Sequence, residues 1–89
     1  MKTFYKQPHD KLDYDVDYSD WLVGTDELVG ATVTTDGDVT IESYTTNSNF
    51  VKIWISGGTN GKTSKITCVA ETADGRLKEK DFKIKVKER

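Results

Sequence analysis

Apolar and polar residues alternate along most of this chain, a pattern typical of β-strands that bury one face. The first example runs from Leu12 to Tyr18, where large apolar residues alternate with Asp13, Asp15 and Asp17. Similar or β-branched segments follow at residues 28–35, 39–41, 51–55, 66–70 and 82–87. No longer window has apolar positions at helical spacing, so we expect essentially no helix.

Short turn sequences separate these segments. They contain the glycines that tight turns with positive φ angles require, in Asp36-Gly37, Gly57-Gly58, Asn60-Gly61 and Asp74-Gly75. Short strands with turns every 8–12 residues are typical of a sandwich or small barrel. We therefore predict an all-β protein, an immunoglobulin-like β-sandwich of about six to seven antiparallel strands. Because Cys68 is the only cysteine, the disulfide-linked antibody subtype is excluded.

The first ten residues differ from the rest, because they contain Pro8, the only proline, in a polar stretch. Proline has no N–H donor and favours an extended preceding residue. We expect residues 1–10 to form an extended, flexible N-terminal arm and residues 11–89 to form one domain. The arm carries Phe4 and Tyr5, which predicts that it docks onto this domain or onto a neighbouring protein.

Composition narrows the possible partners. The net charge is −2 and 31% of the residues are charged, with both signs well represented. Nucleic-acid binding needs a basic field, so we expect no nucleic-acid partner. No segment approaches the ~20 apolar residues that cross a bilayer, and the first residues do not resemble a signal peptide. We therefore expect synthesis in a cytoplasm and no membrane association.

The acidic run of the first strand is a candidate calcium site, formed by Asp10, Asp13, Asp15, Asp17 and Asp20. Alternate residues of a strand project in parallel, about 6.5–7 Å apart. Calcium needs oxygens that converge at about 2.3–2.6 Å. A solvated strand face is therefore the favoured interpretation.

His9 and Cys68 have side chains of the types that take part in catalysis or metal binding. His9 has neither a second histidine for a metal nor a nucleophile at a recognisable spacing. Cys68 lies among apolar neighbours, where a free cysteine behaves as a small hydrophobic residue. We expect no catalytic residue, no metal or cofactor site, and no enzymatic activity.

The last strand carries a basic counterpart of the acidic run. Lys83, Lys85 and Lys87 repeat with the same period of two. We hypothesise that the first and last strands lie side by side, with lysines facing aspartates. Each such pair would contribute about 0.2–1 kcal/mol.

The aromatic residues supply the candidate interface. Trp54 alternates with Ile53 and Ile55, so we expect it to face outward from its strand. An outward tryptophan serves as a protein-interface anchor, a sugar-stacking platform or a surface that the arm covers. We take Phe4, Tyr5 and Trp54 as candidate interface residues. Trp21 follows the first strand, where we expect it to cap the core.

Several motifs occur in a characteristic order: Leu12-Asp13-Tyr14, Ser19-Asp20-Trp21-Leu22, Asp26-Glu27-Leu28, Ile53-Trp54-Ile55-Ser56-Gly57-Gly58-Thr59, and Thr72-Ala73-Asp74-Gly75-Arg76 before an alternating final strand. From Leu12 onward, the chain resembles a family of small fiber–tail adaptor or neck proteins of tailed bacteriophages and prophages. One departure is Ser64, at a position where the family often has an aromatic residue.

The resemblance implies an immunoglobulin-like sandwich in the virion, made in the cytoplasm of a bacterial host and without catalytic activity. Such a protein joins tail or neck components to fiber components through protein–protein contacts, either as a homo-oligomeric ring or bound to ring-forming tail proteins. The alternative is an immunoglobulin-like carbohydrate-binding or surface-adhesion module. That alternative requires coplanar exposed aromatic rings around Trp54.

Overall fold

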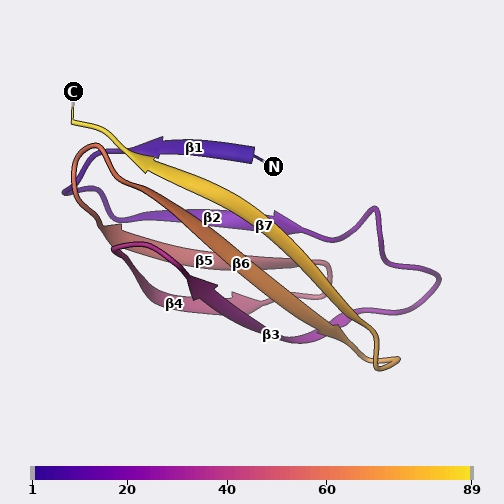
Figure 1. The fold of residues 1–89 in the computed structure, drawn as a ribbon. Helices are drawn as coiled ribbons and strands as arrows, with labels where there is room; N and C mark the ends of the chain where they lie inside the picture. Colours follow the sequence, from indigo (N-terminus) through magenta and orange to yellow (C-terminus); the bar gives the residue numbers. More distant parts are fainter. Residues whose placement is uncertain (1, 89) are drawn as a thin grey trace.

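Two β-sheets packed face to face form the protein in this computed structural model, which describes residues 2–88 (Figure 1). The strands are β1 (Lys2–Lys6), β2 (Leu12–Asp17), β3 (Leu28–Thr35), β4 (Val39–Thr46), β5 (Phe50–Gly57), β6 (Thr63–Thr72) and β7 (Leu77–Val86). The sheets have the strand orders β1-β7-β6-β3 and β2-β5-β4. The prediction of an all-β sandwich is confirmed. Residues 2–88 contain no helix, and so no helix that could cross a membrane.

The strand order is that of an immunoglobulin sandwich with one displaced strand. In the constant type, the first strand lies in the sheet that contains strands two, four and five. Here β1 lies instead at the edge of the other sheet, beside the last strand, β7. The pair is parallel, from Lys2 opposite Phe82 to Lys6 opposite Val86. The prediction of purely antiparallel strands is therefore corrected for this pair.

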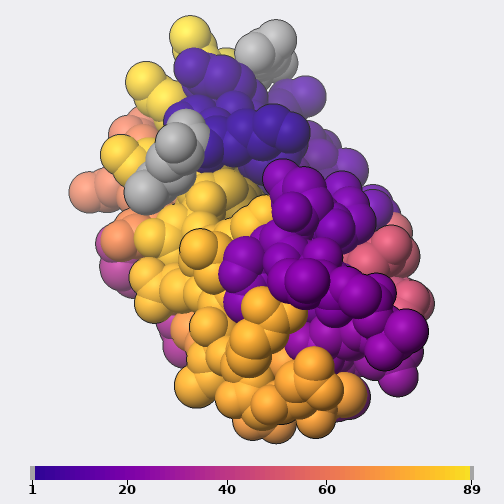
Figure 2. Space-filling view, turned by 90° about the vertical axis from the view of Figure 1, so that its right-hand side faces the viewer, coloured from indigo at the N-terminus to yellow at the C-terminus, as the bar shows by residue number. Residues whose placement is uncertain are grey.

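Half of the expected arm, Lys2–Lys6, is thus a strand of the sheet. Figure 2 shows β1, in indigo, lying against the yellow C-terminal strand. The ring of Phe4 lies 5.1 Å from that of Tyr14 and 5.6 Å from that of Phe82. The arm therefore docks onto its own domain. The alternation of apolar and polar residues did not predict that β1 pairs with β7. Met1 and Arg89, at the outer limits of the predicted arm and domain, lie outside the described residues.

The core consists of the inward-facing half of each alternating segment. On the central strand β5, Val51, Ile53 and Ile55 are fully buried. Ile66, Cys68 and Ala70 of β6 face them from the other sheet and are also fully buried. Burial raises the pKa of the Cys68 thiol, as expected for a cysteine that serves as a small hydrophobic residue.

A hydrogen bond crosses the core where antibody domains carry their disulfide. Tyr18 follows β2, is fully buried, and donates its hydroxyl to the carbonyl oxygen of Cys68 at 2.9 Å. Tyr18 belongs to the β2-β5-β4 side and Cys68 to β6. Antibody domains join the corresponding strands covalently. Here a neutral hydrogen bond links the two layers.

Three of the sequence motifs meet at one end of the sandwich. The Arg76 guanidinium donates to the Asp26 carboxylate through Nε at 3.2 Å and Nη2 at 2.9 Å. The same guanidinium lies 4.4 Å from the centre of the Trp21 ring. Trp21 is half-buried and packs against the core, so its predicted capping role is confirmed. We call Trp21, Asp26 and Arg76 the latch, because they join the loops that follow β2 and β6.

The latch predicts acid sensitivity. Burial alone would raise the pKa of Asp26, but hydrogen bonds from Arg76, Thr72 and backbone N–H groups lower it below its ordinary value. Such a carboxyl stabilises the fold above its unfolded pKa, and this stability is lost as pH falls through the lower folded pKa. We expect the urea midpoint to decrease below about pH 4. Asp26→Asn should lower the midpoint at pH 7 and reduce that dependence.

The matched control is Asp20→Asn, because the Asp20 side chain is 87% exposed. It should leave the urea midpoint near the wild-type value at both pH 7 and pH 4. If both variants have the same pH profile, the latch does not contribute to acid sensitivity.

Candidate protein interface

The outer face of the β2-β5-β4 sheet presents an exposed tryptophan among carboxylates. Trp54 is 37% exposed on the central strand and lies opposite Asp13 on β2 and Ser43 on β4. Its predicted outward orientation is confirmed. We call this surface the acidic face; its carboxylates are those of Asp13, Asp15, Asp17 and Glu42.

One lysine, Lys52, forms ion pairs with two carboxylates of the acidic face. Lys52 Nζ lies 2.8 Å from an Asp13 oxygen and 3.1 Å from an Asp15 oxygen. The hydrogen bond from Lys52 lowers the pKa of Asp13, and the two carboxylates raise the pKa of Lys52. Within residues 2–88, no group of three or more His, Cys, Asp or Glu side chains is arranged to hold a metal ion. The two aspartates therefore converge on an ammonium group.

Lys83 and Lys85 of β7 lie on the opposite side of the sandwich, whereas Lys80 donates to the carbonyl oxygen of Asp17 at 2.6 Å. Lys83 is flanked by Thr3 of β1 and Lys65 of β6, and Lys85 is flanked by Tyr5 and Thr63. The hypothesis that these lysines face the aspartates of β2 within one chain is wrong, because β2 pairs with β5. A period of two sets which side of a strand is polar but not which strand lies beside it. We call Lys65, Lys83 and Lys85 the lysine ridge.

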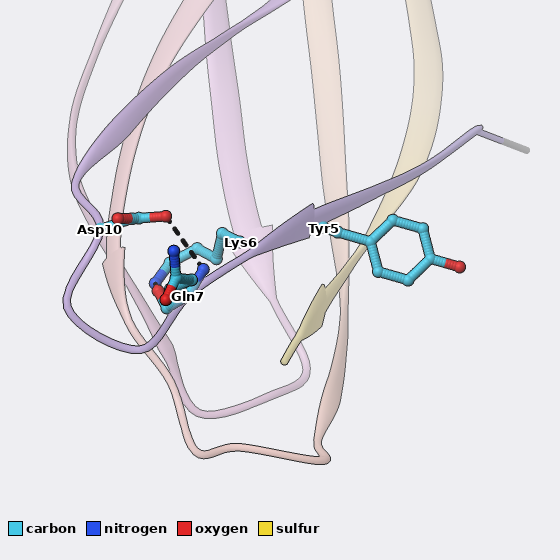
Figure 3. A pocket seen from close by; sticks show the side chains of 4 residues that line it. All are labelled: Tyr5, Lys6, Gln7 and Asp10. Atoms are coloured by element: carbon cyan, nitrogen blue, oxygen red, sulfur yellow. Dashed lines mark hydrogen bonds between the residues drawn. The ribbon is translucent and has the colours of Figure 1, made fainter. Parts of the chain in front are cut away.

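The two aromatic residues of β1 point in opposite directions. Phe4 is half-buried and packs inward, whereas Tyr5 is 55% exposed and lies beside Lys85. Figure 3 shows the Tyr5 ring directed away from Lys6, Gln7 and Asp10. Phe4 thus anchors the strand and places Tyr5 at the edge of the lysine ridge. Contacts of Phe4, Tyr5 and Trp54 with another protein remain a prediction.

A small hollow of about 250 Å³ lies at the turn after β1, lined by Tyr5, Lys6, Gln7 and Asp10 (Figure 3). Lys6 is buried and donates to the carbonyl oxygens of Gln7 at 2.6 Å and Pro8 at 3.5 Å. Burial lowers the pKa of Lys6, and Asp10 partly opposes this effect. The Gln7 N–H donates to Asp10 at 3.0 Å. These polar groups bind one another, which gives the turn a structural role.

The sequence patterns missed a second exposed surface, at the edge strand β3. The register shifts between Leu28 and Gly30, a β-bulge that leaves Val29 55% exposed. Nearby, a shallow hollow of about 430 Å³ is lined by Gly30, Ala31, Thr32, Val69, Glu71 and Leu77. A glycine inside a strand pattern is the sequence signal that indicates such a bulge.

Comparison with known proteins identifies a family that matches most of this chain. A family model described as podophage GP4 fiber-tail adaptor protein gp77 matches residues 6–85. A search of curated proteins gave no match. The matched range contains the latch, the acidic face with Trp54, and the lysine ridge.

Proposed function

This chain belongs to the podophage GP4 fiber-tail adaptor family, and we propose that it joins tail or neck components to fiber components in a phage virion. The match over residues 6–85 carries this proposal, because it includes β2 to β6, nearly all of β7 and all three motifs of the latch. The role is structural and non-enzymatic. The protein acts through protein–protein contacts. Several copies form a homo-oligomeric ring, or the copies bind to ring-forming tail proteins.

The exposed aromatic residues support this role. Trp54 lies on the central strand of its sheet face and is surrounded by polar side chains. Tryptophan and tyrosine are enriched among the few residues that contribute most to binding energy in interfaces, and a polar rim commonly surrounds them. Tyr5 is the corresponding exposed ring on the other sheet. We assign the main contacts to these two side chains and a supporting role to Phe4.

The alternative, a carbohydrate-binding module, requires aromatic rings in one plane. The exposed aromatic side chains among residues 2–88 are Tyr5, Tyr44 and Trp54. Tyr5 lies on the β1 edge of one sheet, and Trp54 lies on the outer face of the other. Tyr44 is opposite the buried Ile53 and so lies on the inner side of β4. This arrangement does not favour sugar binding.

The test uses the phage that encodes this chain. Virions assembled without the gene should have tails that lack fibers, as seen by electron microscopy, and supplying the gene in trans should restore them. Wild-type virions should contain the protein by mass spectrometry. Fibers at normal occupancy in the deletion virions, or virions that never contain the protein, would contradict the adaptor role.

Trp54→Ala should weaken incorporation of the protein into virions. Removal of a central interface tryptophan typically costs at least about 2 kcal/mol of binding, or about 30-fold in affinity. The measurement is the number of copies per virion when the variant is supplied in trans, with the urea midpoint of the purified variant as a check of folding. Leu77→Ala removes a side chain that is 65% exposed on the other sheet, so it should be incorporated normally. Equal incorporation of both variants would remove Trp54 from the interface.

A further inference from the structure

The two outer faces of the sandwich carry local patches of opposite charge. The acidic face has four carboxylates, from Asp13, Asp15, Asp17 and Glu42, and Lys52 pairs with two of them. On the opposite outer face, the lysine ridge of Lys65, Lys83 and Lys85 forms a basic end, and Glu79 and Glu71 lie further along the same face. Among residues 2–88, the ion pair of this ridge joins Lys65 to Asp81 at 3.5 Å. The acidic face and the lysine ridge therefore each retain charge that the nearest side chains do not compensate.

These charges do not meet within one molecule. The acidic face belongs to the β2-β5-β4 sheet, and the lysine ridge belongs to the β1-β7-β6-β3 sheet. The core lies between the two sheets, so the outer faces point in opposite directions. The Asp15 and Lys65 side chains are 52% and 42% exposed. Both surfaces are accessible from outside the molecule.

The two surfaces also match in spacing. The aspartates occupy alternate residues of β2, and Lys83 and Lys85 occupy alternate residues of β7. Alternate residues of a strand lie about 6.5–7 Å apart, so the charges repeat at the same interval on both faces. Each surface also has an exposed aromatic ring, Trp54 next to Asp13 and Tyr5 next to Lys85.

We propose that a second copy of this chain docks on the acidic face through its lysine ridge. This inference rests on the proposed adaptor role, because assembly of the virion would bring several copies of the chain together. It identifies the partner that Trp54 contacts. Because the two surfaces differ and lie on opposite sides of one copy, the contact is heterologous. Repetition of a heterologous contact produces a ring when the rotation closes.

The contact should be weak and salt-dependent in the isolated protein. Exposed charges are screened over about 10 Å at 0.1 M salt. Sedimentation of the purified wild-type chain at low ionic strength should therefore show association that increases with protein concentration and decreases when salt is added. A wild-type chain that remains monomeric at every concentration in low salt would overturn the proposal.

Charge reversal identifies the two surfaces. The double variants Asp15→Lys/Asp17→Lys and Lys83→Glu/Lys85→Glu should each associate at least about tenfold more weakly than the wild type, because like charges then face each other. The quadruple variant that carries all four changes keeps the wild-type net charge and should associate again. The control is Lys11→Glu/Lys78→Glu, which changes the net charge as much as the lysine-ridge variant but at exposed positions outside the ridge.

The outcomes separate this inference from the adaptor role. Circular dichroism and urea midpoints must show that each variant folds. If the control associates as weakly as the lysine-ridge variant, or the folded quadruple variant fails to recover, the contact between these two surfaces is refuted. Normal fiber attachment by the lysine-ridge variant would refute the contact while the adaptor role stands. Fibers attached normally without the protein would refute the adaptor role.

Discussion

Replacing Tyr18 by alanine should destabilise the domain by about 3–5 kcal/mol, the usual cost of removing a buried aromatic side chain. Tyr18 is fully buried, and its ring contacts Trp21 with centroids 6.3 Å apart. The Lys80 ammonium lies 5.1 Å from the centre of the same ring. Small domains have total stabilities of roughly 0.05–0.15 kcal/mol per residue, so this loss is a large share of the total.

Tyr18→Phe separates the hydroxyl from the ring. The variant keeps the packing but removes the donor to the Cys68 carbonyl oxygen, which is 2.9 Å away. Loss of one partner of a buried hydrogen bond costs about 1–3 kcal/mol. Burial raises the pKa of Tyr18 far above its ordinary value, so the hydroxyl remains a donor throughout the neutral range. The phenylalanine variant should therefore be less destabilised than the alanine variant.

Urea denaturation followed by fluorescence measures both variants, since Trp21 lies next to Tyr18. The unfolding midpoint should decrease in the order wild type, Tyr18→Phe, Tyr18→Ala, with a similar slope for all three. If Tyr18→Phe is as stable as the wild type, the hydrogen bond between the sheets contributes no net stability. If it is as unstable as Tyr18→Ala, the ring packing contributes little.

The second large effect is expected at Gly58, in the turn between β5 and β6. Its φ angle is +100°, and a Cβ there would lie 2.6 Å from Val86 Cγ2 and 3.0 Å from Val39 Cγ1. An L-residue with positive φ costs about 1–2 kcal/mol, and overpacking a core costs about 1–3 kcal/mol. Gly58→Ala should thus destabilise the domain by about 2–5 kcal/mol.

Gly61 provides the matched control in the same turn. Its φ angle is +87°, but no heavy atom beyond its chain neighbours lies within 4 Å of the position that a Cβ would take. Gly61→Ala should therefore cost only the backbone term, about 1–2 kcal/mol. The difference between the two urea midpoints measures the clash with the two valines. Equal effects would mean that backbone strain alone explains the requirement for glycine.

The positions of the family motifs in the structure explain what several of their residues do. Gly58 belongs to the motif that contains Trp54, and its missing side chain leaves room for Val86 and Val39 of the core. Trp21, Asp26 and Arg76 belong to three motifs far apart in the sequence, and they form the latch. Most motif residues thus maintain the sandwich. Trp54 is a motif residue that is 37% exposed on the outer face of its sheet, and its contact with a partner remains a prediction.

Alternation of apolar and polar residues was sufficient to predict much of the fold. It placed Ile53 and Ile55 in the core and Trp54 on the surface, because successive residues of a strand point to opposite faces. The residue types of Asp74-Gly75 predict a turn, and Gly75 has a φ angle of +85°. These features depend on one segment at a time, so a single sequence contains the information they need.

Only the tertiary structure decided which segments lie together. Alternation could not show that β1 pairs with β7 or that Asp13 meets Lys52 instead of a lysine of β7. The bond between Arg76 and Asp26 spans 50 residues of sequence, and either partner alone is an ordinary charged residue. Strand pairing and register depend on how all the apolar faces close over one core. The sequence therefore determined which side of each strand is buried, and the packing of the two sheets decided which charges remain available to a partner.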